Sequence, residues 1–316
     1  MAELKFGLIY AALENLMGPG ELAEKAEDWG YDSFWVPDFV LKPRLEAMTV
    51  LTAAAQRTSR IKLGTAVIVL PFRHPLQLAK SAASVDVLSR GRLILGVGIG
   101  ADPREFEVMG EDLRQRARLS DERIEILKRL FIETNVTHNG EFHQFKDVTL
   151  GLPPVQKSIP IWVGAVSKGR IAEGVIRRTA RFADGFMTVD ASVQAYKEAQ
   201  ERIIRQAEAY GRDPSNIEWA VFLWTRLEED PEEAKQKVAR ELASRRLDQM
   251  GAEFGQGAAL GTAQECIEII EEYAALGITH FILDSASPAS EMIQQYEALA
   301  AEVLPHFRRG VVENPA

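Results

Sequence analysis

The chain is poor in the features that mark disulfide-rich and membrane proteins. A single cysteine, Cys266, stands among 316 residues, which excludes an internal disulfide and a cysteine-based metal cluster. No apolar run approaches the roughly 20 residues needed to cross a bilayer. The first residues lack the basic start and the small-residue cleavage site of a signal peptide. We therefore expect a protein of the reducing cytoplasm without a membrane partner.

Positive charge is also scarce. The chain has 37 Lys and Arg against 46 Asp and Glu, a net charge of −9 that argues against nucleic acid as the partner. No HExxH motif and no paired-carboxylate pattern appears, so we expect no metal. The chain does have enough hydrophobic residues for a large core, because they make up 46% of the sequence.

Apolar strands alternate with helices along the whole chain. Strands are expected at 5–10, 33–36, 61–69, 92–97, 159–163, 184–188, 217–224 and 279–283. Helices are expected at 20–29, 44–58, 75–88, 118–133, 168–182, 193–210, 231–250, 262–276 and 288–303. Eight such units over roughly 250 or more residues predict a TIM (β/α)8 barrel, although a doubly wound sheet also alternates strand and helix.

The additional length lies in insertions rather than in a second domain. No linker or change of composition divides the chain, so we expect one domain over 1–316, with insertions near 134–157 and 226–260 and a loose tail from about 308. Residues 138–156 alternate around an Asn-Gly turn and predict a hairpin. The Gly-rich segment 251–261 is either a lid over the substrate or a disordered connection.

The loops after the third and fourth strands should line a site, because ligands bind beyond the carboxyl ends of parallel strands. These loops read PFRHP and GVGIGADP. The second fits the pattern G-x-G-x-x-A of dinucleotide-binding folds. The next expected strand nevertheless lies about sixty residues away, so the βαβ unit that this motif requires is missing.

Five motifs, in this order and spacing, resemble the bacterial luciferase-like superfamily: LGTAVIVLPFRHPLQLAK, DVLSRGRLILGVGIG, PIWVG, ADGF and LGTAQE with ALGITHFIL. The similarity runs from residue 5 to about 305. That superfamily includes FMN-dependent monooxygenases and oxidoreductases that use the 5-deazaflavin coenzyme F420. The resemblance implies a TIM barrel with insertions, a flavin-type ring at the carboxyl end of the barrel and a homodimer.

The resemblance also implies cofactor-binding residues. A non-proline cis peptide at Ala66–Val67, next to Thr65, would end the third strand behind the ring. The segment Gly164, Ala165, Val166 and Ser167 would hold cofactor phosphate near a helix N-terminus, or is a plain turn. The glycines at 96, 98 and 100 would leave room for a flat ring. Ile99 and Gly100 would then contact the ring or the substrate.

Two departures from the family concern the chemistry. Many deazaflavin members carry Asp-His after the second strand, where this chain has Asp38 and Phe39. The Glu of deazaflavin sugar-phosphate dehydrogenases is replaced by Ala101, so we do not expect their reaction. The luciferase His is also missing, which argues against light emission. Asp38 remains as the candidate acid or ring-orienting group. His74 is either catalytic or a structural part of the turn before Pro75.

The leading hypothesis is F420-dependent hydride transfer with a small-molecule substrate. F420 is slightly favoured over FMN by the Thr65-Ala66-Val67 strand end, although no basic groove is evident for its polyglutamate tail. With FMN, the chain would be a two-component monooxygenase supplied by a separate flavin reductase. A non-catalytic flavin-binding protein and a cofactor-free lyase or isomerase are the alternatives. A partly apolar substrate is expected from Phe39, Leu70, Phe72, Trp224 and Phe254.

Overall fold

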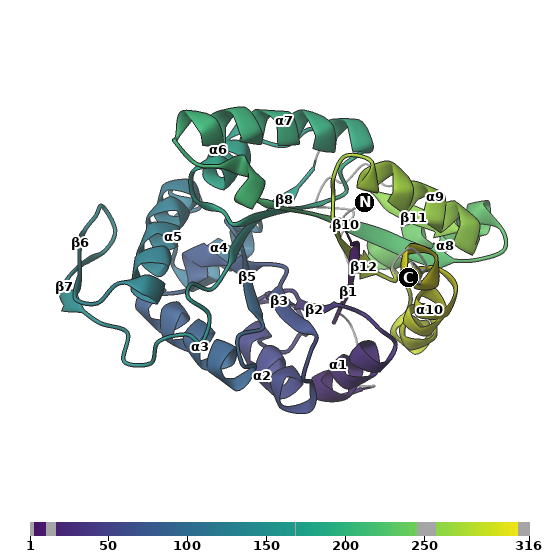
Figure 1. Cartoon of the computed structure of the whole chain (residues 1–316), viewed down its shortest axis with the longest axis horizontal. Coiled ribbons are helices and arrows are strands. Elements are labelled where there is room, and N and C mark those ends of the chain that lie inside the picture. The colour runs from purple at the N-terminus through teal and green to yellow at the C-terminus, as the bar shows by residue number, and fades with distance from the viewer. Residues whose placement is uncertain (1–2, 11–16, 168, 245–256, 309–316) are drawn as a thin grey trace, which may run out of the picture.

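The computed structural model describes residues 3–10, 17–167, 169–244 and 257–308. Its central feature is a closed barrel of eight parallel strands, each paired with the next and the last paired with the first (Figure 1). In order these are β1 (Lys5–Ile9), β2 (Ser33–Val36), β3 (Lys62–Thr65), β5 (Leu93–Gly98), β8 (Ile161–Val166), β9 (Gly185–Val189), β10 (Glu218–Leu227) and β12 (His280–Asp284). The predicted TIM barrel is confirmed.

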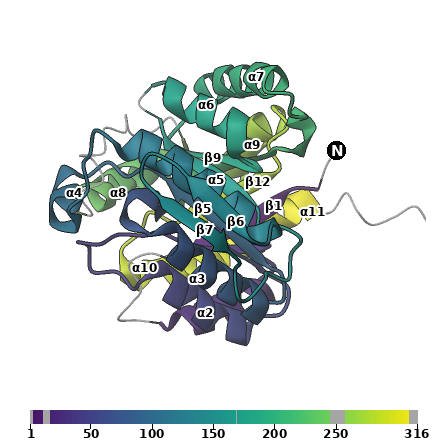
Figure 2. The ribbon, with the colours of Figure 1, turned by 90° about the vertical axis from the view of Figure 1, so that its left-hand side faces the viewer.

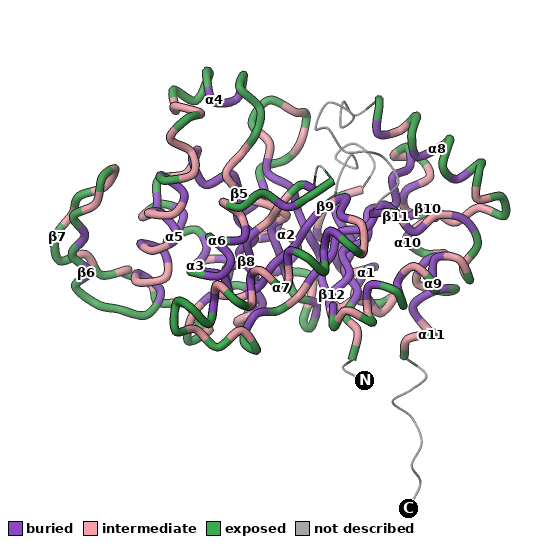
Figure 3. The backbone as a smooth tube through the Cα atoms, turned by 90° about the horizontal axis from the view of Figure 1, so that it is seen from above, coloured by how far each residue is buried: buried purple, intermediate pink, exposed green. Residues whose placement is uncertain are grey.

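Helices surround the barrel in Figure 1. They are α1 (Pro19–Asp28), α2 (Ala47–Arg57), α3 (Pro75–Leu88), α5 (Arg116–Ile132), α6 (Glu173–Phe182), α7 (Val193–Ala209), α8 (Pro231–Ser244), α9 (Ala263–Ala274) and α10 (Ala289–Glu302). Their apolar faces meet the outward side chains of the strands in one continuous core, which includes Leu8, Phe34 and Phe281. In Figure 3 the buried residues, coloured purple, run through the middle of the molecule.

The alternate strand residues form a second cluster inside the barrel, which includes Trp35, Ile94, Trp162 and Phe222. The two indoles fit because glycines face them: a Cβ at Gly7 or Gly64 would collide with Trp35, and one at Gly185 would lie 2.5 Å from Trp162 Cδ1. At the amino-terminal end, Trp35 Nε1 donates to Ser33 Oγ at 2.7 Å, and Ser33 Oγ lies 2.7 Å from His280 Nε2. This half of the interior is filled, so a ligand can enter only from the carboxyl ends of the strands.

The third strand differs from its prediction. It was expected without a break over 61–69, but it divides into β3 and β4 (Ile68–Val69), which is followed by the short 3-10 helix η1 (Leu70–Phe72). The peptide bond Ala66–Val67 between β3 and β4 is cis, as the resemblance implied. Both parts pair with β5, through Leu63 with Leu93 and Ile68 with Val97.

The predicted hairpin is confirmed as β6 (Val136–Asn139) and β7 (Gln144–Val148), which project from the barrel beside α5 (Figures 1 and 2). The sequence did not indicate α4 (Pro103–Met109), η2 (Pro214–Asn216), α11 (Leu304–Arg308) or β11 (Ala258–Gly261), which pairs with the end of β10. Most of the predicted lid at 251–261, the end of the predicted helix at 231–250 and the tail beyond 308 lie outside the described residues.

The two ends of the barrel carry different elements. In Figure 3, α4 and α8, which follow β5 and β10, lie on one side of the molecule and α11 on the other. Val238 and Leu242 of α8 pack into the interior cluster together with Trp224 and Ala286. Helix α8 therefore covers the carboxyl-end opening above β10 and β12.

Candidate active site

The part of the opening that the described residues leave uncovered lies over β3, β5, β8 and β9. Residues at the carboxyl ends of these four strands are partly or well exposed, although the strands are otherwise buried along most of their length. They are all apolar residues or glycines: Ala66, Val67, Ile99, Gly100, Gly164, Ala165, Val166 and Val189. The structure thus brings seven of the predicted cofactor-binding residues to one uncharged surface.

Val67 is fixed between two neighbouring strands. A Cβ at Gly98 of β5 would lie 2.6 Å from Val67 Cγ2, and one at Gly164 of β8 would collide with Val67 Cγ1. At Gly96 a Cβ would collide with the Thr65 carbonyl oxygen. The prediction that Gly96 and Gly98 leave room for a ring is therefore wrong, because the displaced end of the third strand occupies that space.

Gly100 and Thr65 have local structural roles at the same place. Gly100 has a φ of +71°, and a Cβ there would lie 2.8 Å from Val69 Cγ1. Because this conformation strongly favours glycine, Gly100 sets the turn after β5. Thr65 is fully buried, and its hydroxyl donates to the Gly96 carbonyl at 2.7 Å. The Thr65 side chain thereby joins β3 to β5.

Asp38 anchors the segment that follows Val67. Its side chain is nearly buried, with Oδ1 accepting from Arg73 Nη2 at 2.7 Å and Oδ2 accepting from the Val69 amide at 3.3 Å. Arg73 also pairs with Glu46, at 2.9 Å. With both oxygens used in this way, Asp38 acts here as an acceptor that holds β4 and η1. The pairing of Arg73 with Asp38 could not be found from sequence, because the two residues are far apart along the chain.

His74 lies toward the hairpin. It is exposed before the start of α3, and its ring lies edge-on to that of His143, with centroids 5.3 Å apart. Burial, and then the neighbouring Arg123, lowers the pKa of His143 to about 4. Arg123 donates to His143 Nε2 at 3.1 Å and to the Leu70 carbonyl at 2.6 Å, so it joins the hairpin to η1. The His74 ring therefore contacts His143 beside the hairpin, whereas its neighbour Arg73 contacts Asp38.

The predicted phosphate loop begins later than expected. Gly164, Ala165 and Val166 belong to β8 rather than to a loop, and α6 starts at Glu173 rather than near 168. Ser167 follows β8 directly, and its amide donates to the Val189 carbonyl at 3.0 Å. Its hydroxyl is buried and has no hydrogen-bond partner among the described residues.

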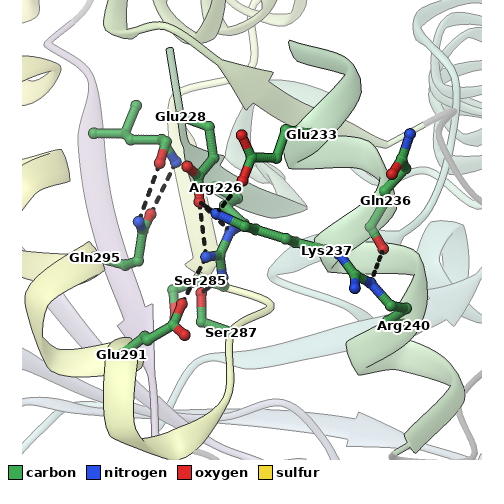
Figure 4. Close-up of polar contacts among 11 residues, drawn as sticks. Arg226, Glu228, Glu233, Gln236, Lys237, Arg240, Ser285, Ser287, Glu291 and Gln295 are labelled. Carbon is green, nitrogen blue, oxygen red and sulfur yellow. Dashed lines mark hydrogen bonds and ion pairs between the residues drawn. The ribbon is translucent and has the colours of Figure 1, made fainter. Parts of the chain in front are cut away.

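Arg226, at the carboxyl end of β10, is part of a charge network (Figure 4). It is 3% exposed and donates to Ser287 Oγ at 2.9 Å and to Glu291 at 2.6 Å. Glu228 accepts from both Arg226 and Lys237, each at 2.8 Å. The network joins β10, α8 and α10, which fixes the cover over that side of the opening.

For Trp224, the sequence could not show whether the indole nitrogen has a hydrogen-bond partner. The sequence predicts it among the apolar residues that face the substrate, and the structure places it in the interior cluster. The structure adds that its indole Nε1 is buried without a hydrogen-bond partner in the described part of the chain. Within the same ranges, no group of three or more His, Cys, Asp or Glu could hold a metal ion, and no helix is long and apolar enough to cross a membrane.

Residues 11–280 match the family model of the luciferase-like monooxygenases, and the chain belongs to that family. It is 27% identical to an F420-dependent glucose-6-phosphate dehydrogenase of Amycolatopsis mediterranei, over 96% of this chain and 99% of that one. A protein of the same name from Microbacterium testaceum is 28% identical, over 97% of this chain and 98% of that protein.

Solved structures show the same fold. The crystal structure of a monooxygenase from Streptomyces bottropensis superposes with a TM-score of 0.81 at 26% identity, covering 96% of this chain and all of that one. An F420-dependent secondary alcohol dehydrogenase in complex with an F420–acetone adduct gives 0.80 at 22% identity, over 95% and 99% of the two chains. At that identity the likeness concerns the fold alone.

Proposed function

We propose that this chain is an oxidoreductase that uses coenzyme F420 for hydride transfer to or from a small organic substrate. The observation that carries the proposal is the uncharged surface at the carboxyl ends of β3, β5 and β8, with Val67 fixed between Gly98 and Gly164. Such a surface suits a flat, largely apolar ring. The near full-length similarity to F420-dependent dehydrogenases supports this choice of ring.

The residues present fit this coenzyme. Ala66, Val67, Ile99 and Gly100 would lie against the ring, and Gly164–Ser167 would lie near its phosphate, where the unpartnered Ser167 hydroxyl offers a donor. When bound, the deazaflavin supplies two-electron hydride transfer at its C5 carbon. The chain would position the ring on a surface that excludes water. The Asp38–Arg73 pair would keep the segment after Val67 in place.

The substrate differs from that of the dehydrogenase relatives. Phe39 stands where many deazaflavin members carry His, and Ala101 stands where deazaflavin sugar-phosphate dehydrogenases carry Glu. Phe39 is partly exposed, with Lys42 Nζ 4.7 Å from its ring centroid, and Ala101 is exposed. Neither side chain can transfer a proton. The proposed substrate is therefore not a sugar phosphate.

A homodimer in the cytoplasm belongs to the same proposal. The family resemblance supports the dimer, and the single buried thiol of Cys266 suits a reducing compartment. An FMN-dependent monooxygenase served by a separate reductase is the second candidate. It is favoured by the 26% identity to the Streptomyces monooxygenase.

Titration of the purified protein with F420, oxidised FMN and reduced FMN, followed by tryptophan fluorescence, tests the proposal. We expect saturable binding of F420 and little binding of either FMN form. Preference for reduced FMN would replace the proposal with the monooxygenase. Binding of neither would refute both. F420 binding without turnover of any hydride donor or acceptor would leave a non-catalytic binding protein.

A further inference from the structure

Trp224 places one unused hydrogen-bond donor inside the opening of the barrel. Its side chain is 7% exposed and lies on the inner face of β10, where its ring meets Phe222 at a centroid distance of 5.0 Å. The indole Nε1 is buried and has no partner among the described residues. A buried N–H without an acceptor costs free energy, so native structures usually provide one from protein, water or ligand.

The surroundings of this donor are mainly apolar. The interior cluster that contains Trp224 consists of hydrophobic side chains, and its partly buried neighbours are Ala66, Val67, Val189, Ala258 and Leu260. Two buried charged residues lie close by: Arg226, which is paired with Glu228 and Glu291, and Asp284, which stands opposite Trp224 in the β10–β12 register and accepts from the Ala286 amide at 2.9 Å. A ligand that reaches Trp224 therefore meets one unused donor in a mainly apolar environment.

The rim of the opening carries exposed apolar side chains beside charged ones such as Lys42 and Arg104. Of the ten exposed large hydrophobic side chains in the described ranges, six lie at or after the carboxyl ends of barrel strands: Val40, Leu41, Leu45, Val108, Met109 and Val166. Glu105 of α4 joins two parts of the rim by accepting from the Val40 amide at 3.0 Å and the Leu41 amide at 3.1 Å. Exposed apolar groups concentrated around a site favour an apolar ligand.

We propose that the Trp224 Nε1–H group binds the substrate's oxygen atom, and that the substrate is an uncharged alcohol or carbonyl compound with a hydrocarbon body. This inference rests on the proposed function, because it assigns the substrate class of the same site. Trp224 has the role of a binding and positioning residue. An indole donates a hydrogen bond but cannot transfer its proton, so Trp224 selects and orients the oxygen.

The test uses Trp224→Phe, which removes the donor and keeps an aromatic ring. Trp219→Phe is the matched control, because Trp219 lies on the same strand but faces outward against Phe186. Turnover is measured with oxidised F420 as the hydride acceptor and with propan-2-ol, cyclohexanol or glucose 6-phosphate as the hydride donor. Cyclohexanone and its oxygen-free isostere methylenecyclohexane, as competitive inhibitors, measure whether the site recognises the oxygen.

We expect turnover of the uncharged alcohols, with kcat/KM lowered roughly 3- to 10-fold by Trp224→Phe and unchanged by Trp219→Phe. The wild-type preference for cyclohexanone over its isostere should fall by the same factor, with the Kd for F420 unchanged. A general loss of packing would weaken both inhibitors equally.

The proposal is overturned if Trp224→Phe keeps the preference for the ketone, or if it weakens F420 binding instead. Turnover of glucose 6-phosphate above that of every alcohol would also overturn it, as would failure to turn over any alcohol while F420 is bound. If the wild-type protein does not bind F420, the proposed function fails and this inference fails with it.

Discussion

Replacing Gly98 with Ala tests whether Val67 is fixed between β5 and β8. The new Cβ would lie 2.6 Å from Val67 Cγ2, whereas carbon atoms in contact are about 3.5–4.0 Å apart. Val67 or β5 must therefore move by about 1 Å. Overpacking of this kind costs typically about 1–3 kcal/mol. The lower chain entropy of Ala in the unfolded state offsets about 0.4–1 kcal/mol of that cost.

We expect a net destabilisation of about 0.5–2 kcal/mol for Gly98→Ala. In a protein of this size that corresponds to a decrease in Tm of about 1–6 °C. Because Val67 belongs to the proposed ring surface, a displacement of about 1 Å should lower kcat/KM on the order of 10- to 100-fold. Thermal unfolding by circular dichroism and F420 turnover measure the two effects.

Two further variants isolate the cause. Val67→Ala removes the methyl groups that the new Cβ would meet, so the double variant should lose less stability than the sum of the two single variants. Gly174→Ala is the control: no atom lies within 4 Å of its Cβ position in α6, and its Tm should stay the same or rise. An unchanged Tm for Gly98→Ala, or strict additivity with Val67→Ala, would refute the described packing.

Three other changes follow from the contacts around the barrel. Asp38→Ala removes the partner of Arg73 and of the Val69 amide, so turnover should fall while F420 still binds; unchanged kcat would remove Asp38 from the account. Burial lowers the pKa of His280 to about 3 from an ordinary 6.5, so the unfolded chain takes up a proton that the folded chain does not, and stability should fall as the pH drops from 6.5 toward 3. His280→Gln should therefore show a smaller difference in Tm between pH 7 and pH 5, and an equal difference would contradict this. Burial, and then Glu265, raises the pKa of Cys266 to about 12, so the native protein should react with a thiol reagent only after unfolding.

The barrel was predictable because its signals are local and repeated. Continuous apolar strands such as 92–97 and periodic helices such as 118–133 carry their own patterns, and their regular alternation specifies the architecture. The short segments β11 and α4 were missed because they are too short to carry such a pattern. The sequence AALG is too short to distinguish from a Gly-rich loop, and α4 spans seven residues.

The site was only partly predictable because its organisation is non-local. Strand-end positions and the family resemblance pointed to Ala66, Val67 and Gly164, which do converge. The reason for the glycines could not be found from sequence, since it depends on Val67 lying across two other strands. The pairing of Asp38 with Arg73 and the unsatisfied Trp224 Nε1 likewise arise only when distant segments pack together.

A crystal structure of the protein with bound F420 tests the central claim most directly. We expect the deazaflavin ring at the carboxyl end of the barrel, against Val67 and Ile99, with its phosphate beside Gly164–Ser167. A ring bound elsewhere, such as beside the hairpin at His74 and His143, would contradict the assigned site even if the affinity were high.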